Sequence, residues 1–354
     1  MLNLDNVSAT IGTFHLKDIS LKVEKGDYFV ILGPSGVGKS LLLETIAGFR
    51  RLDSGSIHLR GADITKQRIQ KRNISIVYQD ADLFPHLSVY ENIAYPIRSK
   101  KEKGVREKVL NAADLTGIVD KLHRKPETLS GGEYQRVSLA RSIAADSDFV
   151  LLDEPLSSID SKARGELLSL LRAINRKGIT VVHVTHDYEE AISVASKIGV
   201  MEHGELVHIA SPEEIFNHPK SEFVAHFIGV KNFFRGTLRS IAKSELKAFK
   251  TKGLIISCLT DAPDGDAFLM IGPDEINISI ARQPSSSRNH FRGTIKDIAH
   301  ARLGYEVTVD VGSDMVVIIT AESRKSLKLD IGKRVWLSFK ASSCRIYRTD
   351  EVNK

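Results

Sequence analysis

A glycine-rich stretch close to the N-terminus carries residue types suited to binding phosphate groups. Residues 33–40 read GPSGVGKS and fit the pattern G-x-x-x-x-G-K-[ST] at every position. The glycines let backbone N–H groups curl around phosphates, the lysine reaches the β and γ phosphates, and the serine hydroxyl is a ligand for Mg²⁺. A chance match is expected in roughly one chain per hundred of this length. The predicted nucleotide-binding residues are Gly33, Pro34, Ser35, Gly36, Val37, Gly38, Lys39 and Ser40.

Two acidic residues at the end of an apolar run are the second feature that could take part in a reaction. Residues 149–155 read FVLLDEP, and four apolar residues followed by acids are typical of a buried parallel strand. Asp153 is expected to hold Mg²⁺ through water, and Glu154 is expected to polarise the attacking water as the catalytic base. The alternative is an ordinary buried strand that ends in solvated acids.

A third motif lies at residues 129–145, LSGGEYQRVSLARSIAA. Ser130 and Glu133 have the spacing of a capping box, so we expect a helix that starts here and presents its N-terminus to an anion. The alternative is a well-capped helix without a ligand. However, the run L-S-G-G-E-x-Q-R is much more specific than a helix cap requires.

These motifs need an α/β fold to bring them together. Residues 28–32 are apolar and β-prone, and the glycine loop and then good helix formers follow them. In an open α/β sheet, ligands bind at the C-terminal ends of the strands. A strand that ends at Asp153 would therefore place both acids beside the phosphate loop. The predicted fold class of this part is an α/β P-loop domain.

Length and composition are those of a globular protein with about two domains. The chain has 354 residues, of which 42% are hydrophobic and 27% are charged. No apolar run reaches the roughly 18 residues of a membrane-spanning helix. The start, MLNLDNVSAT, lacks the basic and apolar regions of a secretory signal. We therefore expect a cytosolic location.

Charge and cysteine content add few constraints. The formal charge of +6 is compatible with polyanionic ligands or a membrane surface, although a solvated basic face is the simpler interpretation. Cys258 and Cys344 lie far apart in the sequence and show neither metal-type spacing nor a disulfide framework.

Residues 1 to about 229 resemble the nucleotide-binding subunits of ATP-binding-cassette (ABC) transporters. The motifs that carry the resemblance are LSGGE at 129–133, the Q-loop with Gln79, the D-loop LSSID with Asp160, and VVHVTHD with the switch histidine His186. The resemblance implies an ATPase that uses ATP and Mg²⁺. It also implies that Gln79 contacts Mg²⁺ and acts in catalysis with Glu154 and His186.

The resemblance also implies how the protein assembles. In this family the signature loop of one subunit closes on the γ-phosphate held by the other, so a homodimer or a paralogous partner is expected. Ser130, Gly131, Gly132 and Asp160 would then act in trans. Closure with ATP and opening after hydrolysis would drive the work.

The region between the phosphate loop and the signature favours an importer over an ABC protein that acts on nucleic acid. Only 91 positions (130 minus 39) separate Lys39 from Ser130, with no sustained heptads between them. The helical region at about 80–145 resembles that of importers, in which residues 79–100 would contact two membrane permease subunits. A separate solute-binding protein and a peripheral position on the cytoplasmic face of the membrane are further expectations.

The contact to adenine departs from the family pattern. An aromatic residue usually stacks on the base, but the corresponding position here is Ile11. Phe14 lies three residues later and could replace it. The residue that stacks on adenine therefore stays open, and base selectivity with it.

Beyond Gly229 the sequence predicts an all-β domain. Short β-type runs alternate with turn residues, as in a small barrel or sandwich. KNFFRGT at 231–237 and RNHFRGT at 288–294 share five of seven residues at an offset of 57 (288 minus 231). We interpret these as two tandem, OB-like β-barrel repeats, at about 230–284 and 285–354. A glycine bulge is the structural alternative.

The polar run before the second repeat, SSRNHFRGTI, resembles the start of the small oxyanion-binding domains of molybdate and tungstate proteins. The second half of that pattern is a lysine followed by small hydroxyl residues, here in FKASS at 339–343. Charged and neutral donors suit a tetrahedral dianion. A polar linker between the repeats is the alternative. The residues that would bind the anion are Ser286, Arg288, Asn289, Lys340, Ser342 and Ser343.

The cargo suggested by this resemblance is molybdate or tungstate, with a C-terminal domain that senses the cargo and inhibits transport. Sulfate, iron, a polyamine or a sugar are the alternatives, and in those cases the C-terminal domain would only pack the dimer.

Overall fold

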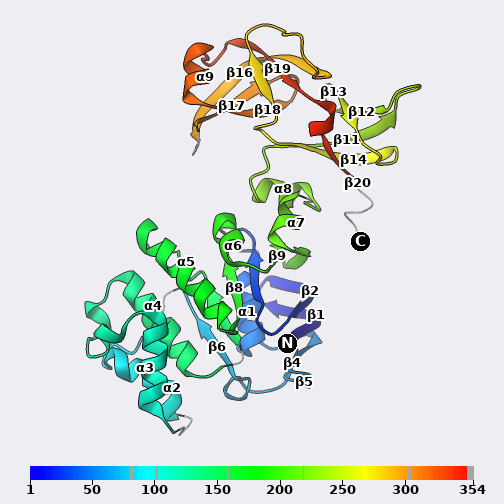
Figure 1. The fold of residues 1–354 in the computed structure, drawn as a ribbon. Helices are drawn as coiled ribbons and strands as arrows, with labels where there is room; N and C mark the ends of the chain where they lie inside the picture. The colour runs from blue at the N-terminus through cyan, green and yellow to red at the C-terminus, as the bar shows by residue number, and fades with distance from the viewer. Residues whose placement is uncertain are drawn as a thin grey trace. The chain divides into compact units, whose positions relative to one another are not determined.

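The computed structural model describes residues 1–79, 83–99, 103–147, 149–157, 159–217, 219–301 and 304–348 (Figure 1). Internal contacts divide the chain into two units, Met1–Ile215 and Phe216–Lys354. The sequence placed this boundary after Gly229. The structure places it earlier because α8 (Glu222–Phe227) packs on the C-terminal unit, where Ala225 joins Phe233 and Phe268 in one apolar cluster. Among the described residues, no helix is long and apolar enough to cross a membrane.

A six-stranded sheet lies at the centre of the N-terminal unit, in the order β10-β9-β3-β8-β7-β6. Five strands are parallel, and β10 is antiparallel to β9. Every residue of β3, β7 and β8 is buried, as expected for parallel strands covered on both faces. The strands are β3 (Tyr28–Leu32), β6 (Ile74–Val77), β7 (Phe149–Asp153), β8 (Thr180–Thr185), β9 (Lys197–Glu202) and β10 (Glu205–Ala210).

A second, antiparallel sheet packs against the central sheet and α1 (Lys39–Ala47) around a common apolar core. Its strand order is β2-β1-β4-β5. In this core, Leu4 and Ile19 of the antiparallel sheet meet Leu42 of α1 and Phe29 of the central sheet. The strands are β1 (Leu2–Ile11), β2 (Phe14–Val23), β4 (Ser54–Leu59) and β5 (Ala62–Asp63).

Three helices form a separate cluster within the predicted range 80–145: α2 (Val89–Ser99), α3 (Val105–Thr116) and α4 (Gly131–Ala144). Figure 1 shows them grouped on the side away from β1 and β2. Their apolar faces pack on one another because all three carry buried aliphatic residues. The other described helices of this unit are α5 (Ser161–Arg176), α6 (Tyr188–Val194) and the short 3-10 helices η1 (Ile69–Lys71), η2 (Val119–Lys121) and η3 (Pro126–Thr128), and α7 (Pro212–Asn217) spans the boundary after Ile215.

The C-terminal unit contains two five-stranded antiparallel sheets, in the orders β13-β12-β11-β14-β20 and β15-β19-β16-β17-β18. Residues of both sheets share one apolar core. The strands are β11 (Asn232–Ser240), β12 (Leu246–Thr251), β13 (Leu254–Leu259), β14 (Gly265–Ile271), β15 (Asn277–Ser279), β16 (Asn289–Ala301), β17 (Gly304–Asp310), β18 (Asp314–Ile319), β19 (Arg334–Phe339) and β20 (Arg345–Arg348), with α9 (Ala321–Ser326) and η4 (Ala341–Ser343) between strands of the second repeat.

The two sequence repeats exchange their last strands. β20, from the second repeat, pairs with β14 of the first, and β15, from the first repeat, pairs with β19 of the second. Each sheet therefore contains four strands of one repeat and one strand of the other. The sequence predicted two consecutive copies but not this exchange, because the pattern of a strand does not specify its partner.

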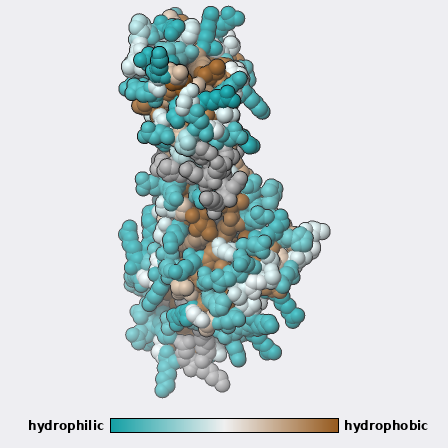
Figure 2. All heavy atoms as spheres, turned by 90° about the vertical axis from the view of Figure 1, so that its right-hand side faces the viewer, coloured by the Kyte–Doolittle hydropathy of each residue, from teal (hydrophilic) through white to brown (hydrophobic). Residues whose placement is uncertain are grey.

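The face of the molecule in Figure 2 is mostly hydrophilic, with hydrophobic patches of limited extent. Exposed aromatic side chains in the N-terminal unit include Phe49 and Tyr95, at 53% and 49% exposure. Phe49 contacts the ring of Tyr78, which precedes Gln79. These side chains lie in or next to the segment predicted to contact a permease.

Candidate functional site

The glycine loop connects β3 to α1, and its backbone adopts conformations that favour glycine. Gly36 and Gly38 have φ angles of 84° and 100°, in the left-handed region. Lys39 is buried, and its Nζ donates hydrogen bonds to the carbonyl oxygens of Gly33 at 2.9 Å and Pro34 at 2.8 Å. Burial lowers the pKa of Lys39, although the nearby Glu154 and Asp153 carboxylates oppose this shift. The ammonium group is therefore held across the loop at the position where phosphates would bind.

Ser40 and Asp153 come together although 113 positions separate them in the sequence. Ser40 Oγ donates a hydrogen bond to Asp153 Oδ1 at 2.9 Å. Asp153 ends β7 and is 8% exposed, and this burial raises its pKa despite the hydrogen bond from Ser40. A hydroxyl and a carboxylate beside a phosphate loop are the oxygen ligands that Mg²⁺ prefers, so these residues fit a Mg²⁺ ion.

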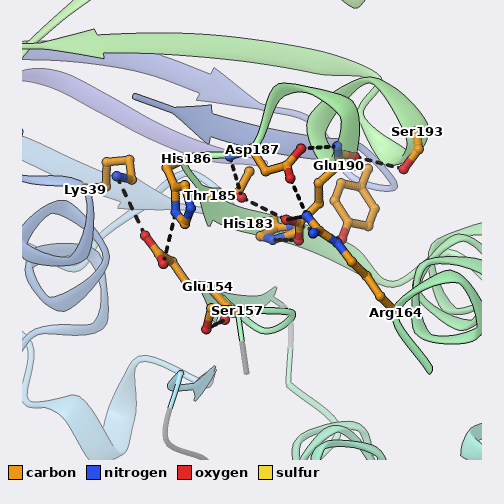
Figure 3. Close-up of polar contacts among 11 residues, drawn as sticks. Lys39, Glu154, Ser157, Arg164, His183, Thr185, His186, Asp187, Glu190 and Ser193 are labelled. Atoms are coloured by element: carbon orange, nitrogen blue, oxygen red, sulfur yellow. Dashed lines mark hydrogen bonds and ion pairs between the residues drawn. The ribbon is translucent and has the colours of Figure 1, made fainter. Parts of the chain in front are cut away.

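Glu154 lies between Lys39 and His186 (Figure 3). One carboxylate oxygen is 3.2 Å from His186 Nδ1, and the other is 3.9 Å from Lys39 Nζ. The backbone turns sharply here, since Glu154 has a φ of 45°, which is uncommon for a residue other than glycine. His186 is 52% exposed and follows the end of β8. The predicted base and the predicted switch histidine are thus direct neighbours.

Gln79 and Phe14 approach the site from two other elements. Gln79 is exposed and follows β6, the neighbour of β7, so it lies at the same edge of the parallel sheet. Phe14 begins β2 and pairs with Ile11 across the β1–β2 turn. A Cβ atom on Gly38 would lie 2.5 Å from a ring carbon of Phe14, so the ring packs directly against the phosphate loop.

The predicted trans-acting residues lie at two helix starts. The capping box is confirmed: Ser130 Oγ accepts a hydrogen bond from the Glu133 N–H, and the Glu133 carboxylate accepts one from the Ser130 N–H. Asp160 caps α5 by accepting hydrogen bonds from two backbone N–H groups of its first turn. Ser130, Gly131 and Asp160 are exposed, and Gly132 is half-buried.

Sequence reasoning missed a group of polar residues behind His186. Figure 3 shows Arg164, His183, Thr185, Asp187 and Glu190 directed toward one another. One signal was present: Asp187 and Glu190 have the D-x-x-E spacing of a helix start, and Asp187 is the N-cap of α6.

Strand register brings the two halves of the predicted oxyanion pattern together. Asn289 pairs with Phe339 between β16 and β19, so Arg288 and Lys340 lie opposite each other just beyond this pair. Ser342 and Ser343 follow in η4. Arg288, Lys340 and Ser342 are exposed, as is Ser286, whereas Ser343 is half-buried. We call Ser286, Arg288, Lys340, Ser342 and Ser343 the basic cluster.

Asn289 differs from the basic cluster because it is buried and paired with backbone groups. Its Oδ1 accepts a hydrogen bond from the Ser257 N–H at 2.8 Å, and its Nδ2 donates to the Ser257 carbonyl at 2.9 Å. Asn232 in the first repeat makes the same pair of bonds with Val316, at 2.7 and 2.8 Å. The shared asparagine thus joins the two sheets in both repeats, a structural role that the anion assignment did not anticipate.

Comparison with known families gives two matches. The ABC transporter model matches residues 16–157, and the TOBE domain model matches residues 285–346. Among solved structures, the dimeric post-hydrolysis state of the ATP-binding cassette MJ0796 bound to ADP and Pi is similar, with a TM-score of 0.54 and 29% identity. That match covers 60% of this chain and 99% of the other.

Curated relatives extend over nearly the whole chain. The molybdate/tungstate import ATP-binding protein WtpC of Pyrococcus abyssi is 37% identical over 353 residues, covering 98% of this chain and 100% of the relative. The spermidine/putrescine import ATP-binding protein PotA of Protochlamydia amoebophila is 39% identical over 317 residues, covering 87% and 85%. The chain therefore belongs to the ATP-hydrolysing subunits of ABC importers and carries a C-terminal TOBE domain.

Proposed function

We propose that this ATPase powers the import of a tetrahedral oxyanion, molybdate or tungstate, and that the basic cluster senses the anion. The observation that carries the proposal is the β16–β19 register, which sets Arg288 opposite Lys340 just beyond the Asn289–Phe339 pair, with Ser342 and Ser343 next along the chain in η4. Two cations and several neutral donors suit a dianion. The full-length similarity to WtpC supports the same cargo.

Import of a polyamine is the second candidate, favoured by the similarity to PotA. A polyamine is a cation, and the basic cluster would repel it. The charge of the cluster therefore argues against a polyamine as the ligand sensed by the TOBE domain.

In the proposed reaction, Glu154 orients and polarises the attacking water. Lys39 and the backbone N–H groups of residues 33–40 hold the β and γ phosphates, and His186 contacts the same carboxylate as Lys39. Ser40, Asp153 and Gln79 would hold Mg²⁺, which would neutralise phosphate charge. The ring of Phe14 is the aromatic surface next to the loop that could contact adenine.

The active form proposed is a homodimer in which Ser130, Gly131, Gly132 and Asp160 complete the site of the second copy. Their exposed helix starts can receive a phosphate or a neighbouring loop. Mixing Lys39→Ala chains with Ser130→Arg chains tests this arrangement, because one composite site in each heterodimer is intact. If the mixture has a higher ATPase activity than either variant alone, the result supports sites shared between two chains. Full ATPase activity of a verified monomer contradicts shared sites.

The assembled transporter would also need two permease subunits, contacted by residues 79–100, and a separate solute-binding protein. In such an assembly the chain would lie on the cytoplasmic face of the membrane. Anion binding to the TOBE domain can inhibit transport only if the open and closed forms of the transporter differ in their affinity for the anion.

Calorimetry of the full chain with molybdate, tungstate, sulfate and spermidine is the deciding experiment. Binding of molybdate or tungstate that is stronger than binding of sulfate supports the proposal. A preference for sulfate would change the cargo, and binding of spermidine would favour the second candidate. Absence of binding for all three anions would leave residues 283–288 as a polar linker.

A further inference from the structure

A buried polar network lies behind His186, and the proposed mechanism above does not use it (Figure 3). Glu190 on α6 is 4% exposed and accepts hydrogen bonds from Thr185 Oγ1 at 2.9 Å and from Arg164 Nη2 at 3.3 Å. Its other oxygen lies 3.1 Å from Nε2 of the fully buried His183, without the alignment of a hydrogen bond. Burying such groups is costly unless they are paired, so this network constrains its surroundings.

The network holds both neighbours of His186. Thr185 Oγ1 accepts a hydrogen bond from the Asp187 N–H at 3.0 Å, and Asp187 Oδ1 accepts one from the Glu190 N–H at 3.0 Å. Arg164 donates to the other oxygen of Asp187. Burial opposes the charge of Asp187, but these donors outweigh burial and lower its pKa. The backbone on each side of His186 is therefore fixed.

Arg164 joins this loop to the start of α5. The helix begins at Asp160, whose Oδ1 accepts hydrogen bonds from the N–H groups of Lys162 and Ala163 at 3.1 and 3.0 Å. About one helical turn separates Asp160 from Arg164, so both move with the same end of the helix. A displacement at Asp160 would therefore move the guanidinium that holds Asp187 and Glu190.

We propose that Arg164 is a positioning residue for ATP hydrolysis, which holds the His186 loop through Asp187 and Glu190 and couples it to the Asp160 end of α5. The inference rests on the proposed roles of His186 and Asp160. In this proposal the Arg164 side chain is the physical connection by which docking of a second copy at Asp160 orients His186 toward Glu154.

Steady-state kinetics and ATP binding of the full chain test the proposal. Arg164→Ala is expected to lower kcat roughly 10- to 100-fold, because a misplacement of about 1 Å can cost that much, while the Kd for ATP stays near the wild-type value. Arg164→Lys keeps the charge without the forked donors and should recover part of kcat. Arg172→Ala is the matched control: Arg172 lies on the same helix and donates to the Ser193 carbonyl at 3.1 Å, at the far end of α6.

Two results would overturn the proposal. The first is an equal loss of kcat in Arg164→Ala and Arg172→Ala at matched thermal stability, and the second is a rise in Kd parallel to the fall in kcat. If Arg164→Ala does not fold, Arg164→Gln keeps most of the side chain but removes the charged fork, and unchanged kcat in that variant is equally contradictory.

His186→Ala separates this inference from the proposed function. Full turnover in that variant would remove the basis for the role of His186 itself. Loss of turnover in His186→Ala together with normal kcat in Arg164→Ala would refute the positioning role alone.

Discussion

The two units of this protein assemble their sites in different ways. In the N-terminal unit the residues predicted to bind phosphate are contiguous, and most of the other predicted site residues lie at the end of a strand or the start of a helix. In the C-terminal unit Arg288 and Lys340 lie opposite each other only because β16 pairs with β19 in one particular register. The first kind of site is visible in sequence motifs, and the second depends on strand pairing.

The two repeats of the C-terminal unit differ in the segment that follows their paired strands. In the first repeat Asn232 of β11 pairs with Ile271 of β14, and in the second repeat Asn289 of β16 pairs with Phe339 of β19. The residues that follow Ile271 and those that follow Phe339 are therefore structurally equivalent. Gly272, Asp274 and Glu275 thus replace Lys340, Ser342 and Ser343. The segment after the strand is thus acidic in the first repeat and basic in the second, although the paired strands before it are equivalent.

The largest effect is expected at the motif-encoded site. Glu154→Gln should lower ATP turnover by ~10²–10⁴-fold, because it removes the carboxylate proposed to polarise the attacking water. ATP binding and anion binding should both persist. Steady-state ATPase assays with parallel nucleotide-binding measurements check this, and a loss of less than about tenfold would contradict the role of Glu154.

A smaller loss is expected at the register-dependent site. Arg288→Ala combined with Lys340→Ala removes both cations, and charge-assisted contacts of about 1.5–3 kcal/mol each predict at least ~100-fold weaker binding of molybdate or tungstate by calorimetry. ATPase activity in the absence of anion should stay near the wild-type rate, since the phosphate loop is unchanged. Anion affinity that survives the double change would place the anion elsewhere.

The shared asparagines should matter for stability in both repeats. Asn232→Ala and Asn289→Ala each remove the side-chain partner of the N–H and C=O of a half-buried residue, Val316 or Ser257, which is expected to cost about 1–3 kcal/mol of unfolding free energy. Trp336 is the single tryptophan of the chain and lies in β19, so its fluorescence during urea unfolding reports on the C-terminal unit. A much larger effect on anion affinity than on stability in Asn289→Ala would instead support direct ligation.

The smallest effect is expected in the acidic repeat. In the unmodified chain the Glu275 carboxylate accepts a hydrogen bond from the Gly272 N–H at 3.1 Å. Asp274→Ser combined with Glu275→Gln removes two negative charges but keeps an acceptor for this N–H. We expect unchanged anion affinity and one anion per chain in calorimetric titration. A second binding event, or a marked change in affinity, would show that the first repeat also takes part.

Much of the fold and of the nucleotide site could be predicted from sequence because the signals are local. Apolar runs predicted β3, β7 and the β-rich character of the C-terminal unit, and Ser130 with Glu133 predicted the start of α4. The acids of β7 were expected beside the phosphate loop, where Asp153 and Ser40 indeed meet. A motif that spans one strand, loop or helix start carries its own geometry in its residue spacing.

Only the tertiary structure decided which distant segments meet. It revealed the exchange of β15 and β20 between the repeats, the pairing of Asn289 with Ser257, and the assignment of α8 to the C-terminal unit. It also placed Arg164 against Asp187, 23 positions away, in the network behind His186. A strand's alternation determines which side is buried but not which strand lies next to it, and a lone arginine on a helix gives no sign of its partner.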